Sequence, residues 1–80
     1  MPALPEGHYG YTVYFIHGYR IDGVVCALTK DDAVAAVKKY HGGVDGPVRL
    51  RNPRAITSKQ LLGMERGHFI DATKQPKEDK

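Results

Sequence analysis

The amino-acid sequence predicts a small α+β domain, in which an antiparallel or mixed sheet carries one main helix on one face. Three observations favour this fold class. Two neighbouring segments rich in aromatic and β-branched residues flank a His-Gly turn, and a capped segment with apolar residues at helical spacing follows them. A shorter segment further along the chain alternates apolar and basic residues. With 80 residues, the chain is long enough for one hydrophobic core and one domain.

The first two segments, residues 9–16 and 19–28, are predicted to pair as a β-hairpin. Facing residues of a hairpin share a face of the sheet, so the length of the loop decides which side chains meet. An odd-numbered loop, such as residues 17–19, separates apolar from charged side chains, whereas a two-residue loop mixes them. Gly23 is a candidate β-bulge, and the inward-facing residues among 24–27 stay undetermined. The expected cross-strand pairs are Ile16 with Arg20, Tyr14 with Asp22, and Phe15 with Ile21.

The main helix is predicted to begin after Thr29 and to end before Gly42 and Gly43. Thr29 is its N-cap, and Asp32 is expected to reach back to it in a capping box. Asp31 and Asp32 also lie at the positive end of the helix dipole, where carboxylates stabilise a helix. The stripe expected to face the sheet consists of Ala33, Val34, Ala36, Val37 and Tyr40.

Three shorter elements are expected after this helix. Residues 47–51 alternate in character and are predicted to form a half-buried strand with Arg49 and Arg51 on its outer side. A second capping box predicts a short helix over residues 58–64, and residues 67–72 are a candidate last strand. The predicted organisation is a loose lead-in (1–8), a single α+β domain (9–73) and a disordered polar tail (74–80).

No pattern of residues indicates an enzyme or a metal site, so no cofactor is expected. The four histidines and Cys26 lack the short paired spacing of zinc ligands. Asp31 and Asp32 point apart on a helix, and the glycines of residues 42–46 lack the Lys-Ser/Thr of a phosphate loop. A chain of this length also leaves little room for a ligand pocket of the usual size. We therefore expect a protein that acts by binding.

The sequence shows no sign of export or of membrane insertion. A single cysteine, Cys26, cannot form a disulfide within the chain, which favours a reducing compartment. The N-terminal residues lack the basic and apolar segments of a signal peptide, and no apolar run reaches the length of a membrane span. We expect a cytoplasmic protein without a membrane partner.

Positive charge is concentrated in one part of the chain. Residues 46–68 carry five basic side chains and one acidic one, whereas residues 1–45 carry four basic and five acidic ones. Strand parity places Tyr and Arg side chains together on the sheet face away from the main helix, unless the second helix or the termini cover part of it. Tyr and Arg suit protein interfaces and also nucleic acid. The candidate contact residues are Tyr14, Arg20, Arg49, Arg51, Arg54 and Lys59.

The order of these elements resembles that of some small anti-CRISPR proteins, inhibitors that phages and mobile elements encode against multi-subunit surveillance complexes. The resemblance rests on a hairpin (Tyr11–Leu28), a helix (Thr29–His41) and a strand (Pro47–Arg51). It covers about half of the chain and includes no shared motif, so it carries over no functional residue. It implies that the basic face lies where guide or target nucleic acid normally runs, or against an acidic patch of the effector.

The first functional hypothesis is a non-catalytic inhibitor or adaptor that binds a host protein or nucleoprotein complex through its Tyr/Arg face. The alternative is a nucleic-acid-binding module that uses the basic segment 49–66. Small dedicated nucleic-acid binders usually have a pI well above 9, and the sequence pI of about 9.1 is borderline by that criterion. A homodimer joined edge to edge is compatible with either hypothesis, because small domains often gain stability by association.

Overall fold

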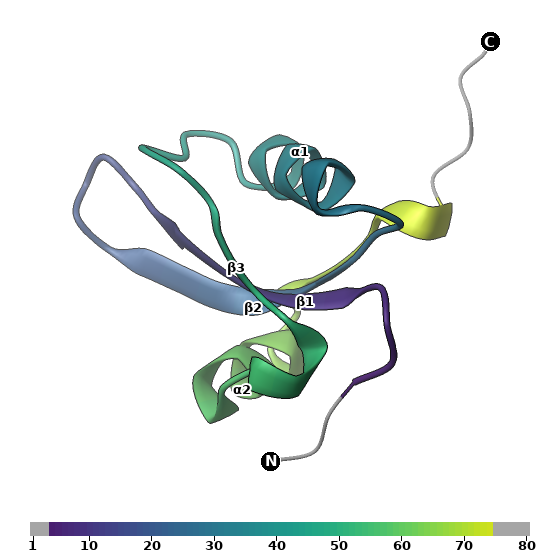
Figure 1. Cartoon of the computed structure of the whole chain (residues 1–80). Helices are drawn as coiled ribbons and strands as arrows, with labels where there is room; N and C mark the ends of the chain where they lie inside the picture. Colours follow the sequence, from purple (N-terminus) through teal and green to yellow (C-terminus); the bar gives the residue numbers. More distant parts are fainter. Residues whose placement is uncertain (1–3, 75–80) are drawn as a thin grey trace, which may run out of the picture.

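One mixed sheet of four strands is the centre of the fold in the computed structural model, which describes residues 4–74. The strand order is β3-β1-β2-β4, with β1 antiparallel to both of its neighbours and β4 parallel to β2. One helix lies on each face of this sheet (Figure 1). The fold class predicted from the sequence is confirmed. The elements are β1 (His8–Tyr14), β2 (Arg20–Cys26), α1 (Lys30–Tyr40), β3 (Arg49–Arg51), α2 (Ser58–Glu65) and β4 (Phe69–Asp71), with short 3₁₀ turns η1 (Pro53–Ala55) and η2 (Ala72–Lys74).

The hairpin loop is odd-numbered, as predicted, but it spans residues 15–19 and is therefore longer than expected. Gly18 adopts a positive φ of 93° and donates its N–H to the carbonyl of Phe15 at 2.8 Å. This turn lets the N–H of Phe15 donate to the carbonyl of Tyr19 at 2.9 Å. Arg20 therefore pairs with Tyr14, two residues before its predicted partner Ile16. The three predicted pairs are therefore wrong by two residues, a shift that leaves every side chain on its predicted face. The observed pairs are Tyr14 with Arg20, Val13 with Ile21, and Thr12 with Asp22.

Gly23 is not a β-bulge, because it pairs with Tyr11 in an uninterrupted register. A Cβ at this position would collide with the carbonyl oxygen of His68 and lie 2.7 Å from the Tyr11 ring. Glycine is therefore required here for the close approach of neighbouring groups. The residues after Gly23 are covered from both sides, so Val24 and Val25 are both buried although they point to opposite faces.

The helix α1 covers the face of the sheet that holds the larger hydrophobic cluster. The side chain of Thr29 accepts a hydrogen bond from the Asp32 N–H at 3.1 Å, which confirms Thr29 as the N-cap. No return bond from the Asp32 side chain is present within residues 4–74, so the predicted capping box is half formed. Of the predicted stripe, Ala33 and Val37 are buried, whereas Tyr40 stays exposed. The cluster consists of Tyr11, Val13, Val25, Ala27, Ala33, Val37 and Ile70.

The helix α2 lies on the opposite face of the sheet and touches it through its backbone (Figure 1). It starts with the complete Thr57–Gln60 capping box predicted from the sequence. A Cβ on Gly63 would collide with the backbone carbonyl of Asp22, and a Cβ on Gly10 would collide with the Gln60 side chain. Two glycines therefore allow α2 to sit directly against β1 and β2.

The first and last strands lie near the two ends of the described residues. The first strand begins one residue before the predicted domain, at His8, whose N–H donates to the Pro5 carbonyl at 3.2 Å. The candidate last strand exists as β4, although it covers only Phe69–Asp71. The predicted tail lies outside the described residues from residue 75 onwards. Among residues 4–74, no helix has the length and apolar character that a membrane crossing requires.

Candidate functional site

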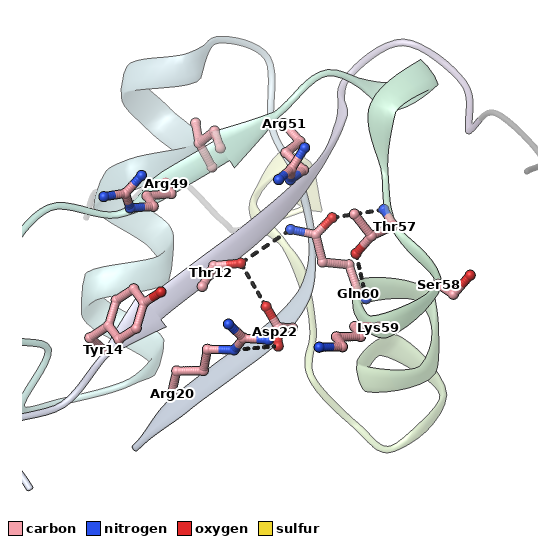
Figure 2. A pocket seen from close by; sticks show the side chains of 11 residues that line it. Thr12, Tyr14, Arg20, Asp22, Arg49, Arg51, Thr57, Ser58, Lys59 and Gln60 are labelled. Atoms are coloured by element: carbon pink, nitrogen blue, oxygen red, sulfur yellow. Dashed lines mark hydrogen bonds and ion pairs between the residues drawn. The ribbon is translucent and has the colours of Figure 1, made fainter. Parts of the chain in front are cut away.

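A groove lies beside α2 on the sheet face opposite α1, and we call it the basic groove (Figure 2). Its volume is about 690 Å³, within the usual range of ligand sites, so the expectation that the chain leaves little room for a pocket is wrong. The space exists because α2 covers only one end of this sheet face. The residues that line the basic groove are Thr12, Tyr14, Arg20, Asp22, Arg49, Leu50, Arg51, Thr57, Ser58, Lys59 and Gln60.

Five of the six candidate contact residues line this one groove, and the sixth does not. Arg54 lies in η1, beyond the end of β3, and borders a separate depression of about 560 Å³ together with residues of the N-terminal segment. The 3₁₀ turn after Asn52 carries the chain away from the sheet, so nearness in sequence did not predict nearness in space. The candidates that the structure brings together are Tyr14, Arg20, Arg49, Arg51 and Lys59.

Two arginines form one wall of the basic groove because of the alternation in β3. Arg49 and Arg51 are exposed, whereas Leu50 between them is half-buried and packs against the core cluster. β3 pairs with β1 through Gly10, Tyr11 and Thr12, which fixes these arginines beside the floor of the groove. Figure 2 shows Arg49 and Arg51 along one side of Thr12, with Arg20 and Lys59 on the other.

The floor of the groove is a chain of hydrogen bonds that links α2 to β2 (Figure 2). Gln60 is 1% exposed, and its Oε1 accepts from the Thr57 N–H at 3.0 Å while its Nε2 donates to Thr12 Oγ1 at 3.3 Å. Thr12 Oγ1 in turn donates to Asp22 Oδ1 at 2.7 Å. Because each polar group on this path has a partner, the floor is held in one arrangement.

The charge of the groove is positive, and most of it is unpaired. Arg20 Nε donates to Asp22 Oδ2 at 3.2 Å, and this is the one ion pair among residues 4–74. The Tyr14 hydroxyl oxygen, followed by the nearby Asp22 carboxylate, raises the pKa of Arg20. Arg49, Arg51 and Lys59 have no carboxylate partner in the described part of the chain. The groove therefore presents three cations to an incoming anion.

Apart from Lys59, the residues that the α2 region contributes to the groove were not predicted from the sequence. Thr57 and Gln60 served there only as capping signals, but their side chains also belong to the wall and floor. The capping box could have indicated this contribution. It places residues 58–60 in the first turn of a helix and fixes the direction in which each of their side chains points. This first turn carries no acidic side chain, so the positive end of its dipole adds to the positive charge of the groove.

A second group of polar aromatic residues lies on the other face of the sheet, at the end of α1. His41 is 9% exposed, and its Nε2 is 2.7 Å from the hydroxyl oxygen of Tyr11. Burial lowers the pKa of His41, and the neighbouring His68 lowers it further. Burial, followed by the influence of Tyr40 and Asp22, raises the pKa of Tyr11. This group is packed within the core and is separated from the basic groove by the sheet.

No set of three or more His, Cys, Asp or Glu side chains within residues 4–74 is placed to hold a metal ion. Comparison of the chain with protein-family models, with curated proteins and with solved structures gave no significant match. The geometry and charge of the basic groove are therefore the features from which a function can be inferred.

Proposed function

We propose that this chain is a non-catalytic binding protein that acts in the cytoplasm of a host cell as an inhibitor or adaptor of a nucleoprotein complex. The basic groove is the surface through which it docks. The observation that carries this proposal is the set of three cations, Arg49, Arg51 and Lys59, that share one groove without a carboxylate partner. Unpaired cations in a concave surface attract and orient an anionic partner.

The surroundings of these cations support a docking role. Tyr14 keeps 41% of its surface exposed beside them, and Tyr and Arg are the residue types that most often dominate binding energy. The floor under them is tied together by the bonds of Gln60 and Thr12, so little ordering is needed when a partner arrives. The order of the elements, which resembles that of some small anti-CRISPR proteins, is consistent with this role.

A paired charge reversal tests the proposal. Arg49→Glu combined with Arg51→Glu should leave the fold intact, because both side chains point into solvent. It should weaken binding of the partner by more than roughly tenfold, since each change replaces an attraction with a repulsion. The measurement is affinity capture from a bacterial lysate, with thermal unfolding of each variant measured in parallel.

The matched control is Lys38→Glu combined with Lys39→Glu, which makes the same change in net charge on α1, away from the groove. We expect the complexes captured by the wild type to be captured by this control and lost with the groove variant. Equal capture by the groove variant and the wild type would contradict the proposal.

A further inference from the structure

We propose that the basic groove holds a stretch of single-stranded nucleic acid, with neighbouring phosphates on Arg49 and Arg51 and a base stacked on Tyr14. This inference rests on the proposed function, and it names the component of the nucleoprotein complex that the chain contacts. Three features of the groove support it: the spacing of the two arginines, the third cation on the opposite wall, and the exposed aromatic ring at one end.

The two arginines are spaced like successive phosphates. They lie two residues apart on one strand and share a face, which places their Cα atoms about 6.8 Å apart. Neighbouring phosphates of an extended single strand repeat at a similar distance, so each guanidinium can take one phosphate. Arginine suits this contact because its planar group donates two parallel hydrogen bonds to phosphate oxygens.

The opposite wall supplies the third cation, and the one negative charge of the groove is paired with Arg20. Lys59 comes from the first turn of α2 and faces the arginines across Thr12 (Figure 2). Asp22 is the one acidic residue of the groove, and it is held by Arg20 and Thr12. A backbone between these walls therefore meets cations on both sides, which is the arrangement of grooves that follow single strands.

Tyr14 distinguishes this ligand from a double helix. The residue is 41% exposed, and its ring lies at the end of the groove away from α2, beside Arg49 and Arg20 (Figure 2). Stacking on this ring needs an unpaired base, because the faces of paired bases are covered by their neighbours in the duplex.

Fluorescence anisotropy with a labelled oligothymidylate of about 12 nucleotides, matched to the usual span of a single-strand site, tests the inference on the full chain. An oligouridylate of the same length, the corresponding duplex and poly-glutamate are the competitors. We expect the single strands to compete well, and the duplex and poly-glutamate poorly. For three phosphate contacts the logarithm of the affinity should fall with that of the salt concentration with a slope of about −2.

Five variants locate the binding on the groove. Arg49→Gln with Arg51→Gln should lower affinity and make the salt slope shallower by about 1.4, because two phosphate contacts are lost. Tyr14→Ala should weaken binding by roughly tenfold, and Tyr14→Phe should restore it, since the ring is what a base stacks on. Tyr14→Leu, which keeps apolar bulk without a ring, should behave like Tyr14→Ala. Lys38→Gln with Lys39→Gln should bind like the wild type.

Two outcomes would overturn the inference and leave the proposed function valid. One is oligonucleotide binding that the groove variants and the α1 control change equally, because the charge of the whole chain would then explain it. The other is failure of the oligonucleotides to bind while the captured complex still depends on Arg49 and Arg51, which would assign the groove to an acidic protein surface. Effective competition by poly-glutamate would point to that same protein surface. Loss of the proposed function itself would appear separately, as capture that is insensitive to the groove.

Discussion

The two faces of the sheet are both covered by a helix, but they are covered in different ways. On the α1 face, large apolar side chains such as Tyr11, Val13 and Val37 interlock and are fully buried. On the α2 face, the sheet buries Val24, and the helix approaches it closely through glycine backbone and the amide of Gln60, over only part of the area. The first contact excludes water from a continuous cluster, whereas the second leaves the basic groove open beside it.

This difference separates the face that supplies most of the apolar burial from the face that we propose for binding. The free energy of folding of such a chain is on the order of a few kcal/mol, so most apolar burial has to be concentrated in one place. The α1 face provides that burial. The α2 face needs little apolar area, so cations and hydroxyl groups can occupy it without weakening the core. The following three changes test this division, in order of decreasing effect.

The largest effect is expected from placing a charge on the α1 face. Val37 is 0% exposed, and Val37→Asp would bury a carboxylate with no partner among apolar side chains. We expect the domain to be unfolded at room temperature, as measured by loss of the cooperative thermal transition in circular dichroism. A cooperative transition near that of the wild type would show that the α1 face contributes much less stability than its burial suggests.

An intermediate effect is expected from a substitution that increases the distance between α2 and the sheet. Gly63→Ala adds a Cβ that collides with the carbonyl oxygen of Asp22, so α2 has to move away from the sheet. Alanine favours a helix by about 1 kcal/mol over glycine, but overpacking against rigid backbone costs about 1–3 kcal/mol, so a net loss of stability is expected. Chemical denaturation measures it. The control is Gly42→Ala, where a Cβ meets open space and stability should stay within about 0.5 kcal/mol.

The smallest effect concerns pH and comes from His41. The folded protein lowers the pKa of this residue, so the unfolded chain binds a proton more readily. Stability should therefore fall as the pH drops below the unfolded value of about 6.5, because a buried imidazolium would face Tyr11, Tyr40 and His68. Thermal unfolding at about pH 7.5 and at about pH 5.5 measures this change. His41→Gln should reduce it, and an unchanged pH dependence in that variant would assign it to other groups.

Local signals in the sequence were sufficient to predict most of the fold. The Thr29 and Thr57 caps and the alternation through Arg49 and Arg51 each depend on a few neighbouring residues, and each is present in the structure. The predicted register of the hairpin was wrong because side-chain parity is the same for several loop lengths. The turn at Gly18 decides among these lengths. The prediction of a β-bulge at Gly23 was wrong because the residue that approaches this glycine, His68, is distant in sequence.

The part of the candidate site that depends on strand parity was predicted from the sequence. The part that depends on tertiary packing was missed. Parity alone placed Tyr14, Arg20, Arg49 and Arg51 on one face, and the structure brings them to one groove. Whether α2 covers that face could not be decided from the sequence, since this depends on the close approach that Gly10 and Gly63 allow. Gln60 joins the floor for the same reason, through its bond to Thr12.

The parallel pairing of β4 with β2 has a consequence for the order in which the chain assembles. The hairpin of β1 and β2 joins residues close in sequence and can form early, whereas Val24 meets Phe69 only after nearly the whole chain is available. During synthesis on the ribosome, the outer edge of β2 therefore stays without its partner until β4 has emerged. A chain interrupted before β4 would expose that edge and the apolar residues Val24 and Val25, and such an edge invites aggregation.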